Sequence, residues 1–172
     1  MAKVLIMMSG IPGSGKSTWA LKQATVMSAP VVISRDEIRK SLIKPGESFF
    51  SHETRVFDTY TKMISAALNS EHYETVFADA TQINWISRKK VINALQLDKD
   101  VKVTYILVNM NTPLSECLIR NMNRKDSVPD KAIFAMNKRH SITDLDYDFF
   151  DCIYNIGEDG RWVALKNEKL DG

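Results

Sequence analysis

The segment from Gly10 to Thr18 places the strongest constraint on what this chain can fold into. It reads Gly-Ile-Pro-Gly-Ser-Gly-Lys-Ser-Thr and satisfies the pattern G-x-x-x-x-G-K-[ST]. It follows a short apolar run over residues 4–8 and precedes an amphipathic stretch. A loop of this kind turns tightly from a strand into a helix, so that successive backbone N–H groups point at a bound phosphate. The alternative, an ordinary strand-to-helix turn, needs neither three glycines nor an adjacent Lys-Ser pair.

The residue types in this loop predict how it would hold a nucleoside triphosphate. Glycine allows positive φ angles and a close approach of the backbone to the phosphates. Lys16 would bring a cation to the β and γ phosphate oxygens, and the Ser17 hydroxyl would ligate Mg²⁺. The loop residues expected to bind the nucleotide are Gly10, Pro12, Gly13, Ser14, Gly15, Lys16, Ser17 and Thr18. We therefore expect ATP, or another NTP, and Mg²⁺ as cofactors.

Apolar β-branched runs alternate with longer amphipathic stretches, which is typical of an α/β fold with a parallel sheet covered by helices. Five strands are expected at about residues 3–9, 31–34, 75–80, 102–109 and 152–156. Helices are expected at about 16–27, 36–43, 52–70, 85–97, 112–124 and 129–139, with Thr112 as N-cap and Pro113 as first helical residue of the fifth. The whole chain, 1–172, is predicted to be one domain. Its lid would lie at about 121–140, and its tail, 157–172, would form a hairpin or a ragged end.

Composition excludes several classes of protein. The 172 residues are 44% hydrophobic and 26% charged, which argues against disordered, collagen-like and coiled-coil chains. The longest apolar run is too short to span a bilayer and the N-terminus has no signal-peptide pattern, so we expect a cytoplasmic location and no membrane partner. Cys117 and Cys152 lack disulfide or zinc spacing and are expected to be reduced core thiols. A net charge of +2 neither demands nor excludes a nucleic-acid partner.

The segment after the second expected strand, residues 34–39, carries acid and base at helical spacing. Working groups of an open parallel sheet lie at the carboxyl ends of its strands. Asp36 and Arg39 would share one helix face, where the carboxylate could accept the proton of an attacking hydroxyl and the guanidinium could hold an anionic acceptor. The alternative is that Asp36 caps the helix and Arg39 is its surface ion-pair partner.

The third expected strand runs straight into Asp79, followed by Ala80 and Thr81. An acid at this position beside a phosphate loop is suited to orienting Mg²⁺ through water or to holding a neighbouring arginine. The alternative is the cap of the next helix, with Thr81 or Asn84 in that role.

Arg120 and Arg124 have i,i+4 spacing ahead of a polar loop and a proline-led helix. Two such cations could close over the nucleotide and neutralise charge on the transferring phosphoryl group. The alternative is a solvated helix face.

Other conspicuous residues favour structural roles. The run Arg88-Lys89-Lys90 is expected on an exposed helix face. Core burial is favoured over base stacking for Phe49 and Phe50. The histidines have no metal-ligand spacing and are expected at the surface or in caps.

Taken in order, these blocks resemble the polynucleotide 5′-hydroxyl kinase domains of phage and bacterial nucleic-acid repair enzymes. The matching blocks are residues 10–18, 34–39, 79–81 and 120–124, within a resemblance over residues 3–140. The resemblance implies a three-layer P-loop kinase fold with strand order 2-3-1-4-5 and a nucleic-acid 5′ end as partner. Gln82 departs from the Asn common in relatives, which puts the local acceptor geometry in doubt. No D-x-D-G-T phosphatase signature is present.

The resemblance also implies roles. Asp36 would be the general base, Arg39 would contact the 3′-phosphate of the acceptor while braced by Asp79, and Arg124 would stabilise the transition state. The resulting assignments are catalytic Lys16, Asp36, Arg39 and Arg124; acceptor-binding Arg39, Asp79 and Thr81; metal-binding Ser17 and Asp79; and nucleotide-binding Arg120 in addition to the loop.

The expected reaction is transfer of the γ-phosphate of ATP to the 5′-hydroxyl of RNA or DNA. A first alternative keeps the fold and changes the acceptor to a small molecule, as in zeta-toxin or antibiotic-phosphotransferase kinases. A second is an NTP-binding module without transferase activity; against it, there is no N-K-x-D guanine-reading segment.

Overall fold

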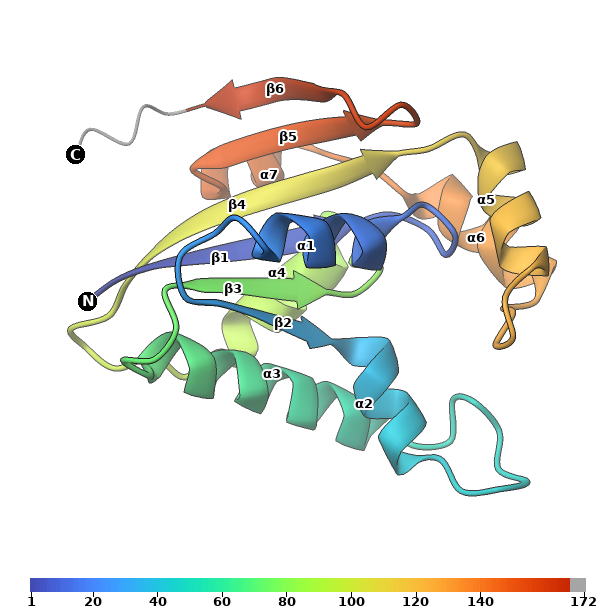
Figure 1. The fold of residues 1–172 in the computed structure, drawn as a ribbon, viewed down its shortest axis with the longest axis horizontal. Helices are drawn as coiled ribbons and strands as arrows, with labels where there is room; N and C mark the ends of the chain where they lie inside the picture. Colours follow the sequence, from blue (N-terminus) through green and yellow to red (C-terminus); the bar gives the residue numbers. More distant parts are fainter. Residues whose placement is uncertain (168–172) are drawn as a thin grey trace.

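A single sheet runs through the computed structural model, which describes residues 1–167, and helices cover both of its faces (Figure 1). The strands are β1 (Ala2–Ser9), β2 (Pro30–Ser34), β3 (Thr75–Asp79), β4 (Lys102–Asn111), β5 (Cys152–Gly157) and β6 (Trp162–Asn167). The helices are α1 (Lys16–Ala24), α2 (Arg35–Leu42), α3 (Glu53–Asn69), α4 (Trp85–Ala94), α5 (Leu114–Met122), α6 (Asp130–Arg139) and α7 (Asp144–Phe149).

The strand order is β2-β3-β1-β4-β5-β6. The first five strands pair in parallel, which confirms the predicted order 2-3-1-4-5. The sixth strand was expected only as one arm of a possible hairpin, and it pairs antiparallel with β5 at the edge of the sheet. The tail is therefore a hairpin as far as Asn167, and the rest of the predicted tail, 168–172, lies outside the described residues.

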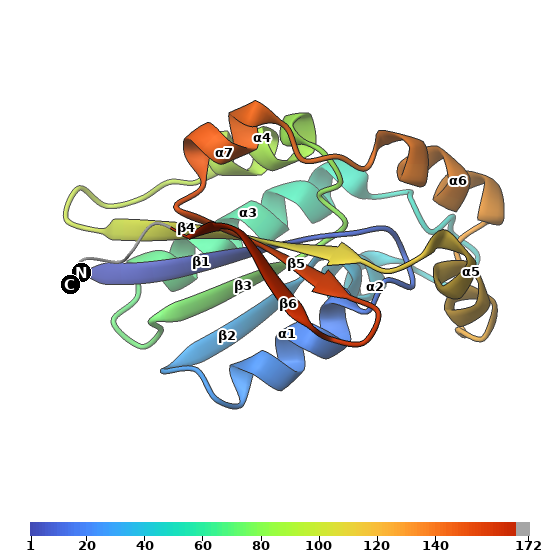
Figure 2. The ribbon, with the colours of Figure 1, turned by 90° about the horizontal axis from the view of Figure 1, so that it is seen from above.

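Successive side chains of the strands point to opposite faces of the sheet and pack into two hydrophobic cores. On one face, Leu5 and Met7 of β1 pack with α3 and α4, and on the other Ile6 and Met8 pack against Trp19 of α1. Figure 2 shows α3, α4 and α7 on one side of the sheet and α1 on the other. Strands covered on both faces need apolar side chains at successive positions, which is why they appear as unbroken hydrophobic runs in the sequence.

Helices α5 and α6 stand beyond the carboxyl ends of the strands rather than on a sheet face (Figure 2). A third apolar cluster fixes them there, formed by Ile11 of the glycine-rich loop, Ile83, Cys117 of α5 and Ile133 of α6. Pro113 is the N-cap of α5 and not its first helical residue, because the helix begins at Leu114. The Thr112 hydroxyl, expected to cap this helix, instead donates a hydrogen bond to the Ser14 carbonyl, 2.8 Å away.

Helix α7 was not predicted. Its start is a capping box in which Thr143 and Asp146 exchange side-chain and backbone hydrogen bonds. The helix has six residues, too few for an apolar periodicity to stand out in the sequence.

The expectation of an exposed Arg88 is wrong, although its neighbours Lys89 and Lys90 are exposed. Arg88 and Asp146 are both 0% exposed and form a two-pronged ion pair, with Nε–Oδ1 at 2.7 Å and Nη2–Oδ2 at 2.8 Å. Arg88 also donates to the Gln82 and Ser141 carbonyls and to the Ser9 hydroxyl. A charge can be buried when its partner and all its donors are satisfied, and no local pattern reveals a partner 58 residues away.

Cys117 and Cys152 are buried, as composition predicted. Within residues 1–167 there is no helix with the length and apolar character needed to cross a membrane.

Candidate active site

The loop between β1 and α1 has the tight turn that its glycines predict. Gly13 has a φ of +81° and Gly15, the N-cap of α1, a φ of +95°. A Cβ on Gly13 would lie 2.4 Å from the Cys117 carbonyl oxygen, so the loop passes directly against α5. Helix α1 begins immediately afterwards, and its N-terminal N–H groups give this end of the cleft a positive potential.

Lys16 folds back over the loop. Its Nζ donates to the Ile11 carbonyl at 3.0 Å and to the Ser14 hydroxyl at 3.4 Å. Burial lowers the pKa of Lys16 to about 8, and the negative charges of Asp79 and Asp36 oppose that shift. The ammonium is therefore held in a site that disfavours charge, where an anionic ligand would be a strong partner.

Ser17 and Asp79 meet at the entrance to this loop. The Ser17 hydroxyl donates to Asp79 Oδ2 at 2.6 Å. Burial raises the pKa of Asp79, and the hydrogen bond from Ser17 and the charge of Lys16 partly offset the shift. A hydroxyl and a carboxylate beside a phosphate cradle are oxygen donors of the kind that Mg²⁺ prefers, so these two residues fit the predicted metal role.

Helix α2 begins with Ser34 as its N-cap, whose hydroxyl accepts from the Glu37 N–H at 3.4 Å. The suggestion that Asp36 caps this helix is therefore wrong. Asp36 lies in the first turn, its side chain half exposed, and forms an ion pair with Arg39. Both residues line the same cleft as the phosphate loop.

Glu53, the first residue of α3, holds the arginines of α2. Its carboxylate accepts from Arg39 Nε at 2.5 Å and Nη2 at 3.0 Å, and from Arg35 Nη2 at 3.1 Å. Burial alone would raise the pKa of Glu53, but the hydrogen bonds and charges of the two arginines hold it below its usual value. The brace that the resemblance assigned to Asp79 is thus supplied by Glu53, because Asp79 is turned toward Ser17. Sequence reasoning missed Glu53, which lies 14 residues from Arg39 and across a loop.

Phe49 and Phe50, expected in the core, lie at the cleft instead. Their rings meet edge to face, with centroids 5.0 Å apart, and the Arg39 guanidinium lies 5.0 Å from one centroid and 5.5 Å from the other. Phe50 is 49% exposed. The pair covers the guanidinium rather than filling the interior.

Residues 81–84 continue from β3. The Thr81 carbonyl accepts from the Gly10 N–H at 2.9 Å, and Thr81 lines the cleft. Asn84, one of the two candidates for the cap of α4, forms its capping box with Ser87. Gln82 is buried, and its side-chain amide donates hydrogen bonds to the Met8 and Ala78 carbonyl oxygens. The glutamine that stands where relatives often carry Asn therefore links the end of β3 to β1.

The two predicted arginines of α5 and its following turn differ in their contacts. Arg120 is anchored by Glu116 at 2.9 Å and reaches to 3.5 Å from the Gly13 carbonyl oxygen, directly over the loop. Arg124 is exposed and lines the cleft. Asp126, two residues further on, lies 3.4 Å from Lys40 Nζ of α2, so the α5–α6 loop contacts α2 across the cleft.

One cleft of about 670 Å³ brings these residues together at the carboxyl ends of the strands. The predicted residues that line it are Pro12, Gly13, Ser14, Gly15, Lys16, Ser17, Thr18, Asp36, Arg39, Asp79, Thr81, Arg120 and Arg124. Gly10 is buried behind the loop and does not line the cleft.

Residues 5–142 match the sequence model of a family described as an AAA domain. The chain belongs to this family. With its phosphate loop and strand order, it is a P-loop enzyme of the kinase type.

Solved structures share the fold of this P-loop kinase. A fungal RNA kinase matches with a TM-score of 0.66 and 14% identity, over 100% of this chain and 79% of that one. A chain of the Pnkp1/Rnl/Hen1 RNA repair complex matches with a TM-score of 0.60 and 19% identity, over 98% of this chain and 50% of that one. The L-seryl-tRNA(Sec) kinase of Methanococcus maripaludis is 25% identical over 174 residues, 98% of this chain and 65% of the relative, so the P-loop kinase described here spans about two thirds of that protein.

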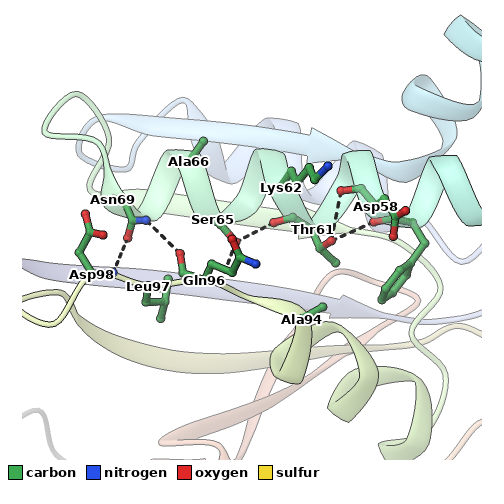
Figure 3. Close-up of a pocket in the computed structure, with 11 residues that line it drawn as sticks. Asp58, Thr61, Lys62, Ser65, Ala66, Asn69, Ala94, Gln96, Leu97 and Asp98 are labelled. Carbon is green, nitrogen blue, oxygen red and sulfur yellow. Dashed lines mark hydrogen bonds between the residues drawn. The ribbon is translucent and has the colours of Figure 1, made fainter.

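A second hollow of the P-loop kinase, about 510 Å³, lies along α3 and the segment after α4 (Figure 3). Its polar groups bond to each other: the Ser65 hydroxyl accepts from the Gln96 N–H, and the Asn69 side chain bonds to Gln96 and Asp98. None of the predicted site residues lies in it. Its hydrogen bonds fasten the loop before β4 to α3.

Proposed function

We propose that this chain is a polynucleotide kinase that transfers the γ-phosphate of ATP to the 5′-hydroxyl of an RNA or DNA end. The observation that carries the proposal is the Asp36–Arg39–Glu53 assembly, which shares one cleft with the phosphate loop. A module that only binds NTP has no use for a carboxylate and a braced guanidinium facing its phosphate site. Two proteins that share this fold, the fungal RNA kinase and a chain of the RNA repair complex, are associated with RNA, which supports the choice of a nucleic-acid acceptor.

The donor side positions the triphosphate. Backbone N–H groups of residues 13–17 and the Lys16 ammonium would bind the β and γ phosphates, and Ser17 with Asp79 would hold the metal ion. When bound, Mg²⁺ would supply positive charge that offsets the negative charge of the phosphates. Arg120, anchored over the loop, and Arg124, on the predicted lid at about residues 121–140, would add charge that offsets the negative charge of the transferring group.

The acceptor side positions the nucleophile. Asp36 accepts the proton of the 5′-hydroxyl as its oxygen attacks the γ-phosphorus. Arg39 has five N–H donors, and three of them bond to Glu53 and Asp36 in the described structure. The proposal assigns the other two to a 3′-phosphate of the acceptor, which would fix the sugar with its 5′-hydroxyl beside Asp36.

The test is γ-labelled ATP with a 5′-hydroxyl oligonucleotide. Wild type is expected to label the oligonucleotide, and Asp36→Asn to lower kcat by about 10³-fold, within the range for loss of a general base. ATP affinity should stay unchanged. Glu37→Gln is the matched control, because Glu37 is an exposed acid in the same helical turn that pairs with Lys40 and does not line the cleft. No labelling by wild type, or full activity in Asp36→Asn, would contradict the proposal.

A second candidate acceptor is the seryl hydroxyl of an aminoacylated tRNA. The match to the L-seryl-tRNA(Sec) kinase over 98% of this chain favours it. Both reactions use the same donor site and a carboxylate base, so they differ in the acceptor alone. Parallel assays with seryl-tRNA and with a 5′-hydroxyl oligonucleotide of equal length distinguish them by which one accepts the label.

A further inference from the structure

We infer that Phe49 and Phe50 form a stacking platform for the nucleobase of the 5′-terminal nucleotide of the acceptor. The inference deepens the proposed function and rests on it for the identity of the acceptor. Phe50 presents its ring and Phe49 braces it.

The first argument is exposure. Phe50 is 49% exposed although it lies in a cleft that also contains Asp36 and Arg39. Leaving a large aromatic ring in water forgoes the stabilisation that its burial would provide. The neighbouring apolar clusters do not include either phenylalanine, so neither ring serves the core of the domain. A ring kept outside the core and inside the substrate cleft is available to a ligand.

The second argument is rigidity. Phe49 meets Phe50 at an interplanar angle of 87°, and both rings lie over an arginine that Glu53 grips with two hydrogen bonds. The loop between α2 and α3 is also held from within. The Glu47 carboxylate accepts from the Lys44 N–H at 2.9 Å and lies 2.7 Å from His52 Nε2. The rings are therefore preorganised, which lowers the entropy cost of binding.

The third argument is placement along the acceptor. In the proposed function Asp36 takes the 5′-hydroxyl and Arg39 the 3′-phosphate, which are the two ends of one nucleoside unit. The ring pair lies over the same guanidinium that would hold that 3′-phosphate. The base of this same unit is joined to the sugar beside that phosphate and is thus within reach of the rings. Stacking tolerates any base, because every base has a π-face.

The experiment measures binding and transfer separately. Binding of a 5′-hydroxyl oligonucleotide is compared with that of the same oligonucleotide lacking only its 5′-terminal base, with a non-hydrolysable ATP analogue present. Wild type is expected to bind the complete oligonucleotide about tenfold more tightly, a difference of about 1.4 kcal/mol. Phe50→Ala should lose about tenfold with the complete oligonucleotide and nothing with the abasic one. Phe50→Trp should keep the preference, and Phe50→Leu, apolar but without a π-face, should lose it.

Tyr73→Ala is the matched control, because Tyr73 is an exposed aromatic residue between α3 and β3, 37% exposed, and does not line the cleft. It should bind both oligonucleotides as wild type does. Equal weakening of both ligands by Phe50→Ala, or no effect on either, would overturn the platform. Base-dependent binding without phosphate transfer would leave the platform standing and overturn the proposed function. Phosphate transfer that depends neither on the base nor on Phe50 would overturn the platform and leave the proposed function standing. Absence of binding would overturn both.

Discussion

The donor and acceptor halves of the cleft are built in different ways. In the donor half, residues 10–17, the loop shape is set by glycines, and Lys16 bonds to atoms of its own loop. In the acceptor half, residues 34–53, the shape depends on side chains of two helices that meet through one carboxylate, Glu53. The difference means that the proposed nucleotide site is shaped mainly by local sequence, whereas the proposed acceptor site depends on a tertiary contact.

Among the comparisons of the two halves, the largest expected effect is on catalysis, through Lys16 of the donor half. Lys16→Met should lower kcat by about 10²- to 10³-fold, because a positioned charge on the phosphate oxygens is lost. The folded structure should persist, since Lys16 makes its hydrogen bonds only within its own loop in the described structure. Single-turnover rates with γ-labelled ATP measure the change. A loss of folding instead would mean that the donor half also depends on distant contacts.

The same substitution should raise stability. The pKa of Lys16 is about 8 in the folded chain against an ordinary value of 10.5. The unfolded state therefore binds more protons between these values, so wild-type stability rises with pH across that window, and the cost of the buried charge is fully present below pH 8. Lys16→Met should gain up to about 3 kcal/mol at pH 7, and the gain should shrink toward pH 10.5. Urea unfolding at several pH values measures it; a gain that does not depend on pH would contradict this cause.

Two glycines with similar backbone angles compare the halves directly. Gly13 has a φ of +81° with the Cys117 carbonyl in the way of a Cβ, and Gly46 has a φ of +86° with nothing within 4 Å. Gly46→Ala should cost about 1 kcal/mol, the usual penalty of the left-handed conformation. Gly13→Ala should cost about 2–3 kcal/mol and weaken ATP binding, because the clash is added. Equal costs, measured by thermal unfolding, would show that crowding at α5 is unimportant.

The smallest expected effect comes from the brace of the acceptor half. Glu53→Gln should raise the KM for the oligonucleotide about tenfold and leave the KM for ATP unchanged, since Arg39 loses one of its two charged partners. Stability should fall by about 1 kcal/mol, because Glu53 is partly exposed. The pKa of Glu53 is below 4.5, so this contribution is present above pH 4.5 and is lost as pH falls through the lowered value. A change in the KM for ATP would contradict the view that the donor and acceptor halves of the cleft act independently.

Sequence reasoning succeeded where structure is local. The glycine pattern predicted the loop, apolar runs predicted five strands, and the resemblance to a kinase family predicted their order. It failed where a side chain finds a distant partner. The local sequence predicts an exposed Arg88, because its partner Asp146 is distant in the chain. It also favours core positions for Phe49 and Phe50, because it gives no sign of the Arg39 guanidinium against their rings. Spacing alone placed Asp36 and Arg39 together but gave no sign of Glu53.

The buried pair of Arg88 and Asp146 also bears on where this domain can be cut. The family match ends at residue 142, but the partner of Arg88 lies four positions beyond that limit. A fragment stopped at the match would leave an uncompensated cation next to Ser9, the last residue before the phosphate loop. A shortened version of this enzyme should therefore retain α7, a helix that does not line the cleft.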